Sequence, residues 1–281
     1  MSRHPFDPSL EDLPQEIPIF PLMGAMILPG GYIPLNVFEP RYINMVLDAM
    51  RTPTRLIGVI QPRFDPDETD GLTAGLPSER DEATSKDAAP ESAAAGLAAT
   101  AAPKKTTSKS KAPLADESTE SAETDDHHPP ALYDIGCAGR ISAFSEEEDG
   151  RILLRLTGVC RFRVEQELPK LHGYRRVLPA WQEFVGDLQG DKEAQGLINR
   201  DRLLPTLREY FRLQSIDANW DSIRDTGDEP LITTLCLISP LEPQEKQALL
   251  EAPTLIDRAK ILQTLIEMAV LSDNISGSTP N

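Results

Sequence analysis

Positive charge is scarce in this chain. Its 281 residues carry 45 Asp and Glu but only 28 Lys and Arg, which gives a formal net charge of −17 at pH 7. A phosphate backbone would be repelled by such a protein. We therefore expect no nucleic acid as its main partner.

Cysteine is also rare, and its three positions, Cys137, Cys160 and Cys236, are far apart. They form no C-x-x-C motif, and each lies in an apolar run, where a thiol behaves as a small hydrophobic group. We expect three buried structural thiols in a protein of a reducing compartment.

Long apolar runs are absent as well. No segment approaches the roughly 18–20 apolar residues of a membrane span. The first 18 residues lack the apolar core of a signal peptide. The sequence therefore predicts a soluble, cytoplasmic protein that does not bind a membrane.

The motifs of common catalytic sites are missing. The chain has no phosphate-binding G-x-x-x-x-G-K-[ST], no G-x-S-x-G and no H-E-x-x-H. Its histidines, His4, His127, His128 and His172, are scattered, and the acidic run 146–149 lacks the alternating carboxylates and glycine of a calcium loop. We expect no catalytic residue, no metal and no cofactor.

Residues 66–130 differ in composition from the rest of the chain. They contain no Phe, Trp, Tyr, Ile, Val, Met or Cys, so they bury too little apolar surface to offset the entropy of ordering. We interpret them as a disordered insertion between two strands of one domain. The four lysines between Lys104 and Lys111 could form a basic docking tract, although a solvated linker is the simpler interpretation.

The stretch from Ile17 to Tyr42 contains two predicted strands, the turn between them and the start of a helix. Two apolar segments, 17–28 and 33–38, read as strands on either side of the Pro29-Gly30-Gly31 turn signal. The proline in the second segment suggests an edge strand or a bulge. Pro40 suits the first position of a helix, and an apolar stripe continues to Met50.

Further along, apolar spacing changes from a period of two to a period of 3.6 near Gly190. Strands are predicted first, at 55–61, 132–144, 151–156 with its continuation past Gly158, and 174–184. Helices follow: one at 197–211 bent at Pro205, one near 220–223, then 230–238, 244–251, and a last helix from the Thr254 N-cap to about Leu271. Strands followed by helices favour an α+β fold.

Several short motifs, in this order and spacing, resemble the N-terminal domain of Lon-type proteases, the region that recognises substrates. In the first half they are Ile19–Leu22, Leu28–Gly30, Pro34-Leu35 and Phe38–Tyr42. In the second half they are Gly139-Arg140, Leu156–Phe162 and Pro240–Glu251. Taken alone, Gly158 with Arg161 and Phe162 reads as a bulged strand rather than a binding site.

The resemblance implies a PUA-like open β-barrel with one short helix, followed by a small helical bundle. The expected divisions are a flexible tail at 1–15, a β domain at 16–185 that carries the insertion, a helical subdomain at 186–272, and a flexible tail at 273–281. Because neither a nucleotide site nor a serine–lysine peptidase site is found, we expect a standalone form that lacks the ATPase and peptidase domains.

The resemblance also implies a function: non-catalytic recognition of unfolded or apolar polypeptide segments, as an adaptor or accessory factor of an ATP-dependent protease. An extended peptide could pair with a sheet edge or lie in a groove between barrel and bundle. The candidate contact residues are Tyr32, Phe38 and Tyr42, with core packing or helix capping as the alternative role for each. Two other functions stay open, a PUA-like RNA-binding module and a small-molecule enzyme in the barrel–bundle cleft.

Overall fold

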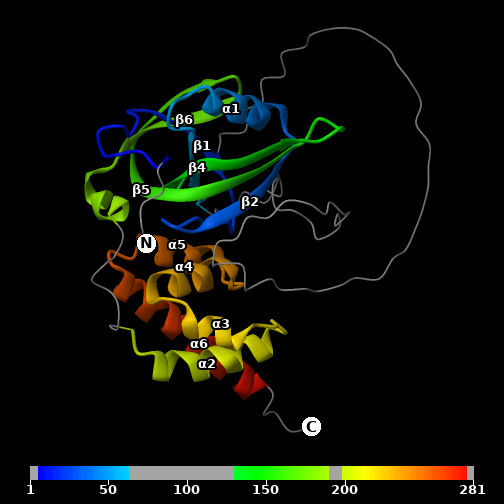
Figure 1. Ribbon diagram of the computed structural model, residues 1–281, viewed down its shortest axis with the longest axis vertical. Coiled ribbons are helices and arrows are strands. Elements are labelled where there is room, and N and C mark those ends of the chain that lie inside the picture. The colour runs from blue at the N-terminus through cyan, green and yellow to red at the C-terminus, as the bar shows by residue number, and fades with distance from the viewer. Residues whose placement is uncertain (1–5, 64–129, 190–197, 277–281) are drawn as a thin grey trace, which may run out of the picture.

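A computed structural model describes residues 6–63, 130–189 and 198–276 (Figure 1). The predicted insertion lies outside these ranges except for Pro130. The strands are β1 (Ile17–Pro21), β2 (Tyr32–Val37), β3 (Leu56–Ile60), β4 (Ile135–Glu146), β5 (Ile152–Leu171) and β6 (Tyr174–Ala180). The helices are α1 (Pro40–Met50), the 3-10 helix η1 (Gln182–Leu188), α2 (Arg200–Leu213), α3 (Trp220–Asp225), α4 (Asp228–Ile238), α5 (Pro243–Glu251) and α6 (Leu255–Ser276).

Five of the strands pair in a closed ring. β1 is parallel to β3, and the ring continues antiparallel through β4, β5 and β6 back to β1. Phe162 of β5 fills the interior: a Cβ added at Gly58 or Gly136 would approach its ring to 2.8 and 2.7 Å. Two strand glycines therefore make room for one aromatic side chain.

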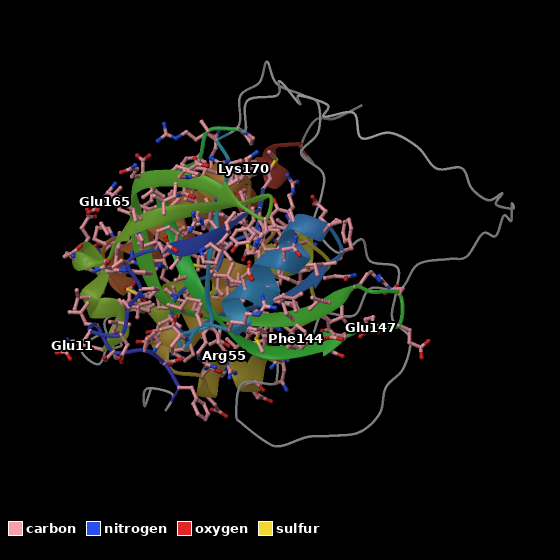
Figure 2. All side chains as sticks on the ribbon, turned by 90° about the horizontal axis from the view of Figure 1, so that it is seen from above. Glu11, Arg55, Phe144, Glu147, Glu165 and Lys170 are labelled. Atoms are coloured by element: carbon pink, nitrogen blue, oxygen red, sulfur yellow. The ribbon has the colours of Figure 1, made fainter. Side chains whose placement is uncertain are left out.

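The sixth strand, β2, lies outside this ring. It pairs antiparallel with the first half of β5 and, within the described residues, with no other strand. Pro34 lies in it, as expected for an edge strand, because proline donates no backbone hydrogen bond. β4 and β5 form a hairpin whose turn lies at Glu147, near the end of this pairing (Figure 2).

The helical region, which we define as α2–α6, follows the sheet in sequence and lies on the side of it opposite α1 (Figure 1). The predicted α+β class is therefore confirmed. The apolar segment at 230–238 is a helix whose Leu231, Ile232, Leu235 and Cys236 are all buried. Thr254 caps α6, since its hydroxyl accepts from the backbone N–H of Asp257 at 3.1 Å.

Several predicted boundaries differ from the structure. The first strand ends at Pro21 rather than Leu28, because Gly24 turns the chain with a φ of +69°. The last strand ends at Ala180 rather than Phe184, and η1 follows it. The last helix continues past Leu271 to Ser276.

The described part of the N-terminal segment, where a flexible tail at 1–15 is predicted, contacts β4 and the residue that follows β6. Arg140 forms an ion pair with Asp7 at 3.0 Å, and the Trp181 indole N–H donates to the carbonyl of Pro14 at 3.0 Å. These contacts come from residues more than 130 positions away, so local composition did not reveal them.

All three cysteines are free and buried, as predicted. Burial raises the pKa of Cys160 and of Cys236 to about 12, which keeps both thiols protonated at neutral pH. None of the helices in the described ranges is long and apolar enough to cross a membrane.

Candidate functional site

The outward side of β2 and of the paired part of β5 carries exposed and partly exposed side chains, and we call it the outer face. Its residues alternate with the buried Leu35 and Val37 of β2, and cross-strand partners lie on the same side of the sheet. The register pairs these residues as Tyr32 with Thr157, Pro34 with Arg155, and Asn36 with Leu153.

Apolar side chains are unusually exposed on and beside this outer face. Tyr32 is 54% exposed and Leu153 is 43% exposed. Phe38, directly after β2, is 52% exposed. The guanidinium of Arg155 lies 5.1 Å from the centroid of the Tyr32 ring and holds that ring on the surface. Two of the three predicted contact residues thus lie where a partner could reach them.

Tyr42, the third predicted contact residue, lies in the core. It is 9% exposed, and its ring centroid is 4.2 Å from that of Phe20. Burial raises the pKa of its hydroxyl. This placement agrees with the alternative role of core packing, and it also anchors the first turn of α1, directly after Phe38.

A second group of polar residues joins the sheet to the helical region. Arg161 of β5 is buried and forms a two-bond ion pair with Asp187, with Nε–Oδ2 at 2.9 Å and Nη2–Oδ1 at 2.8 Å. Its other terminal nitrogen donates to the carbonyls of Leu250 and Ala252. Burial alone would lower the pKa of Arg161, but Asp187 raises it overall. We call Arg161, Asp187 and these carbonyls the junction.

Two glutamines support the same contact between sheet and helices. Gln61 donates to the carbonyl of Pro243 at 3.0 Å, and Gln247 donates to the carbonyl of Ile135 at 3.0 Å. The two side chains also hydrogen-bond to each other at 3.2 Å. Sequence reasoning assigned no role to either; the available signal was a glutamine at the end of an apolar strand and another within a family motif.

The glycine motifs of the two halves meet in space. Gly30 donates to the carbonyl of Gly158 at 3.0 Å, and Gly158 donates to the carbonyl of Gly31 at 2.8 Å. A Cβ at Gly158 would collide with the backbone carbonyl of Leu28. The β4–β5 register shifts at this point, which confirms the predicted bulge.

His172, Asp48 and Tyr174 form a hydrogen-bonded group that joins α1 to the β5–β6 turn. His172, with φ +47°, hydrogen-bonds through Nδ1 to Asp48 at 2.7 Å, and Tyr174 donates to the same carboxylate at 3.0 Å. Burial acts to raise the pKa of Asp48, but the bonds from His172 and Tyr174 outweigh it and lower this pKa. In the part of the chain that the structure covers, no group of three His, Cys, Asp or Glu could hold a metal ion.

A family model for the substrate-binding domain of the ATP-dependent protease La (LON) matches residues 16–268. The chain belongs to this family. The match covers most of the sheet and helical region and includes both the outer face and the junction.

Two curated Lon proteases match over a short part of the chain. Lon protease 2 of Myxococcus xanthus is 39% identical over 61 residues, which cover 22% of this chain and 7% of that protein. The Lon protease of Anaeromyxobacter dehalogenans (strain 2CP-C) is 38% identical over 69 residues, or 23% of this chain and 8% of that protein. The match thus spans less than a tenth of the length of either relative.

Two solved structures are also similar to this chain. A Lon N-terminal domain protein from Xanthomonas campestris has 21% identity and a TM-score of 0.47, covering 89% of this chain and 97% of that one. The N-terminal domain of Mycobacterium avium complex Lon protease has 12% identity and a TM-score of 0.47, covering 90% of this chain and 98% of that one.

Proposed function

We propose that this LON substrate-binding domain binds unfolded or apolar polypeptide segments on its outer face. One observation carries the proposal: Tyr32 and Phe38, at the two ends of β2, and Leu153 of β5 are exposed, and one edge of β2 pairs with no strand among the described residues. A surface that exposes large apolar groups beside an open strand edge favours an extended chain as its ligand.

Binding would combine two kinds of contact. The edge of β2 that has no partner strand in the described ranges offers backbone groups to an added strand, although Pro34 contributes no donor. The side chains of Tyr32 and Phe38 would cover apolar side chains of the bound segment. Tyr42 would act indirectly, since its packing on Phe20 fixes the start of α1 and with it the position of Phe38.

We further propose that the chain performs no catalysis and serves an ATP-dependent protease as an adaptor or accessory factor. The family match supports this proposal because it concerns the substrate-binding domain alone. In this view a PUA-like β domain at 16–185 and a helical subdomain at 186–272 act as one unit, joined through Arg161.

The proposal is tested with the full chain and two fluorescent, permanently unfolded polypeptides, one rich in Leu and Phe and one in which these are Ser. Fluorescence anisotropy should show binding of the apolar polypeptide. The double variant Tyr32→Ser/Phe38→Ser should weaken it about tenfold or more, because exposed aromatic anchors dominate such contacts.

A matched control is available on α6. Met268 and Leu271 are 59% and 61% exposed but lie in the helical region, so Met268→Ser/Leu271→Ser removes similar apolar area elsewhere. Binding should be unchanged in this control. Equal weakening in both double variants, or equal binding of the two polypeptides, would contradict an outer-face site.

A further inference from the structure

A pocket of about 130 Å³ lies between the sheet and the helical region. Its wall combines Arg161 of β5 and residues of η1 with residues of α4 and the start of α6, including Arg258. An engineered cavity of about 150 Å³ is large enough to hold benzene, so this pocket has room for a small organic molecule.

Arg258 is the unusual residue of this pocket. It is only 6% exposed, and its Nε donates to the carbonyl of Leu249 at 2.9 Å. Among the described residues, this is the one hydrogen bond of its guanidinium, and no carboxylate there forms an ion pair with it. Its terminal nitrogens are therefore donors without a partner in the described part of the chain.

Arg258 lines the pocket, and its terminal nitrogens are not fully enclosed. Within the described ranges, the fully enclosed side-chain atoms that lack a hydrogen bond are Asn36 Oδ1 and Ser239 Oγ. The unpaired nitrogens of Arg258 therefore retain some accessible surface, and the pocket is the space that this residue lines. A buried cation in this state gains most from an anionic ligand that replaces its lost hydration.

The carboxylates of Glu183, Asp187 and Glu229 also line the pocket, and no ion pair joins any of them to Arg258 in the described residues. Asp187 is occupied by Arg161, and Glu183 forms a two-bond ion pair with Arg163 at 2.7 and 2.8 Å. Burial and then the charge of Arg161 lower the pKa of Arg258, which agrees with a cation beside another cation.

We propose that this pocket binds a small monocarboxylate, with its carboxylate on the terminal nitrogens of Arg258. The planar guanidinium matches a carboxylate with two parallel hydrogen bonds. Phe184 and Leu255 supply apolar wall for the carbon part of the ligand. Asp187 and Glu229, which also line the pocket, disfavour a dianion such as phosphate.

This site is separate from the outer face and does not depend on polypeptide binding there. The carboxylate could belong to a free small acid or to the C-terminus of a peptide, and the two sources differ only in the group attached to the carboxylate. Titration with both kinds of ligand distinguishes them.

The test uses calorimetric titration of the full chain with acetate at constant ionic strength, with acetamide as the neutral analogue and phosphate as the dianion. We expect acetate to bind and the other two to bind at least about tenfold more weakly. A tripeptide with a free C-terminus is titrated as well, with its C-terminal amide as the neutral analogue. If the tripeptide binds more tightly than acetate, the ligand is a peptide C-terminus. If the tripeptide binds more weakly than acetate, the ligand is a free small acid.

Three variants assign the site. Arg258→Gln should weaken acetate binding about tenfold or more, whereas Glu229→Gln should strengthen it by removing a repelling charge. Arg202→Gln is the control, because Arg202 forms an exposed ion pair with Glu267 away from the pocket. If Arg258→Gln does not fold, the increase in acetate affinity expected for Glu229→Gln still tests the proposal.

The proposal is wrong if acetate and acetamide bind alike, if acetate does not bind, or if Arg202→Gln weakens binding as much as Arg258→Gln. Unchanged acetate affinity in Glu229→Gln would also overturn it. None of these results bears on the outer-face proposal, which is measured with a different ligand and different variants.

Discussion

The outer face and the junction are built in opposite ways, although β5 contributes to both. On the outer face, Tyr32 and Leu153 expose apolar groups to water and few polar contacts hold them. At the junction, Arg161 and Asp187 bury charges that are fully occupied by each other and by carbonyls. Exposed apolar groups are available for a partner, whereas buried paired charges are committed to the fold.

This contrast indicates where substitutions should affect folding and where they should affect binding. Removing one member of a buried ion pair leaves an uncompensated charge, which is costly. Removing an exposed side chain that contacts few neighbours costs the fold little. The two regions should therefore respond differently to changes of similar chemical size.

The greatest loss of stability is expected at the junction. Arg161→Met should lower the free energy of unfolding by about 3–5 kcal/mol, because it leaves the buried Asp187 carboxylate without its cationic partner and removes the guanidinium donor of the Leu250 and Ala252 carbonyls. Denaturant unfolding followed by circular dichroism measures this loss. The neighbouring Arg163→Met is the control, since its pair with Glu183 is exposed and should contribute less than about 1 kcal/mol. Equal losses in the two variants would refute the contrast.

A smaller but still clear effect is expected where the glycine motifs meet. Gly158→Ala should destabilise the fold by about 1–3 kcal/mol or more, since the added methyl group meets the backbone carbonyl of Leu28. Gly186→Ala is the matched control, because a Cβ there has nothing within 4 Å. Thermal unfolding of both variants distinguishes them; a harmless Gly158→Ala would show that the turn at Leu28–Gly31 can move aside.

The least change in stability is expected at the outer face. Phe38→Ser should change the free energy of unfolding by no more than about 0.5 kcal/mol, as is usual for exposed positions. The same denaturant experiment measures it. A loss comparable to that of Arg161→Met would mean that Phe38 is a structural residue, and it would remove the sharpest difference between the two regions.

Much of the architecture was predictable from local patterns. Pro34 indicated an edge strand and Thr254 the start of the last helix, and both are present. Each of these features depends on the conformational preference of one or two residues and their near neighbours, which is information that a sequence contains.

The junction could not be found in the same way. Successive side chains of a strand point to opposite faces, so Arg161 lies on the other side of β5 from Cys160 and Phe162. A strand residue on the outward side is ordinarily solvated, but here the helical region covers it. Arg161 is buried by η1, through Asp187 and Phe184, and by residues about 90 positions later in the chain.

The candidate contact residues show the same limit. Tyr32, Phe38 and Tyr42 are similar aromatic residues within 11 positions, and nothing in their spacing separates them. The structure exposes the first two and buries Tyr42 against Phe20. Whether an aromatic side chain is available depends on which element packs over it, and that is decided by distant segments.

Short motifs and composition were enough to establish the family, the α+β order of strands and helices, the main turns and the acidic character of the chain. Tertiary packing was needed to show which polar groups are buried together, as with Arg161 and Asp187, and which apolar groups remain exposed, as with Tyr32 and Phe38. The physical reason is that burial is a property of contacts between segments far apart in the chain, whereas propensity and periodicity are properties of neighbours.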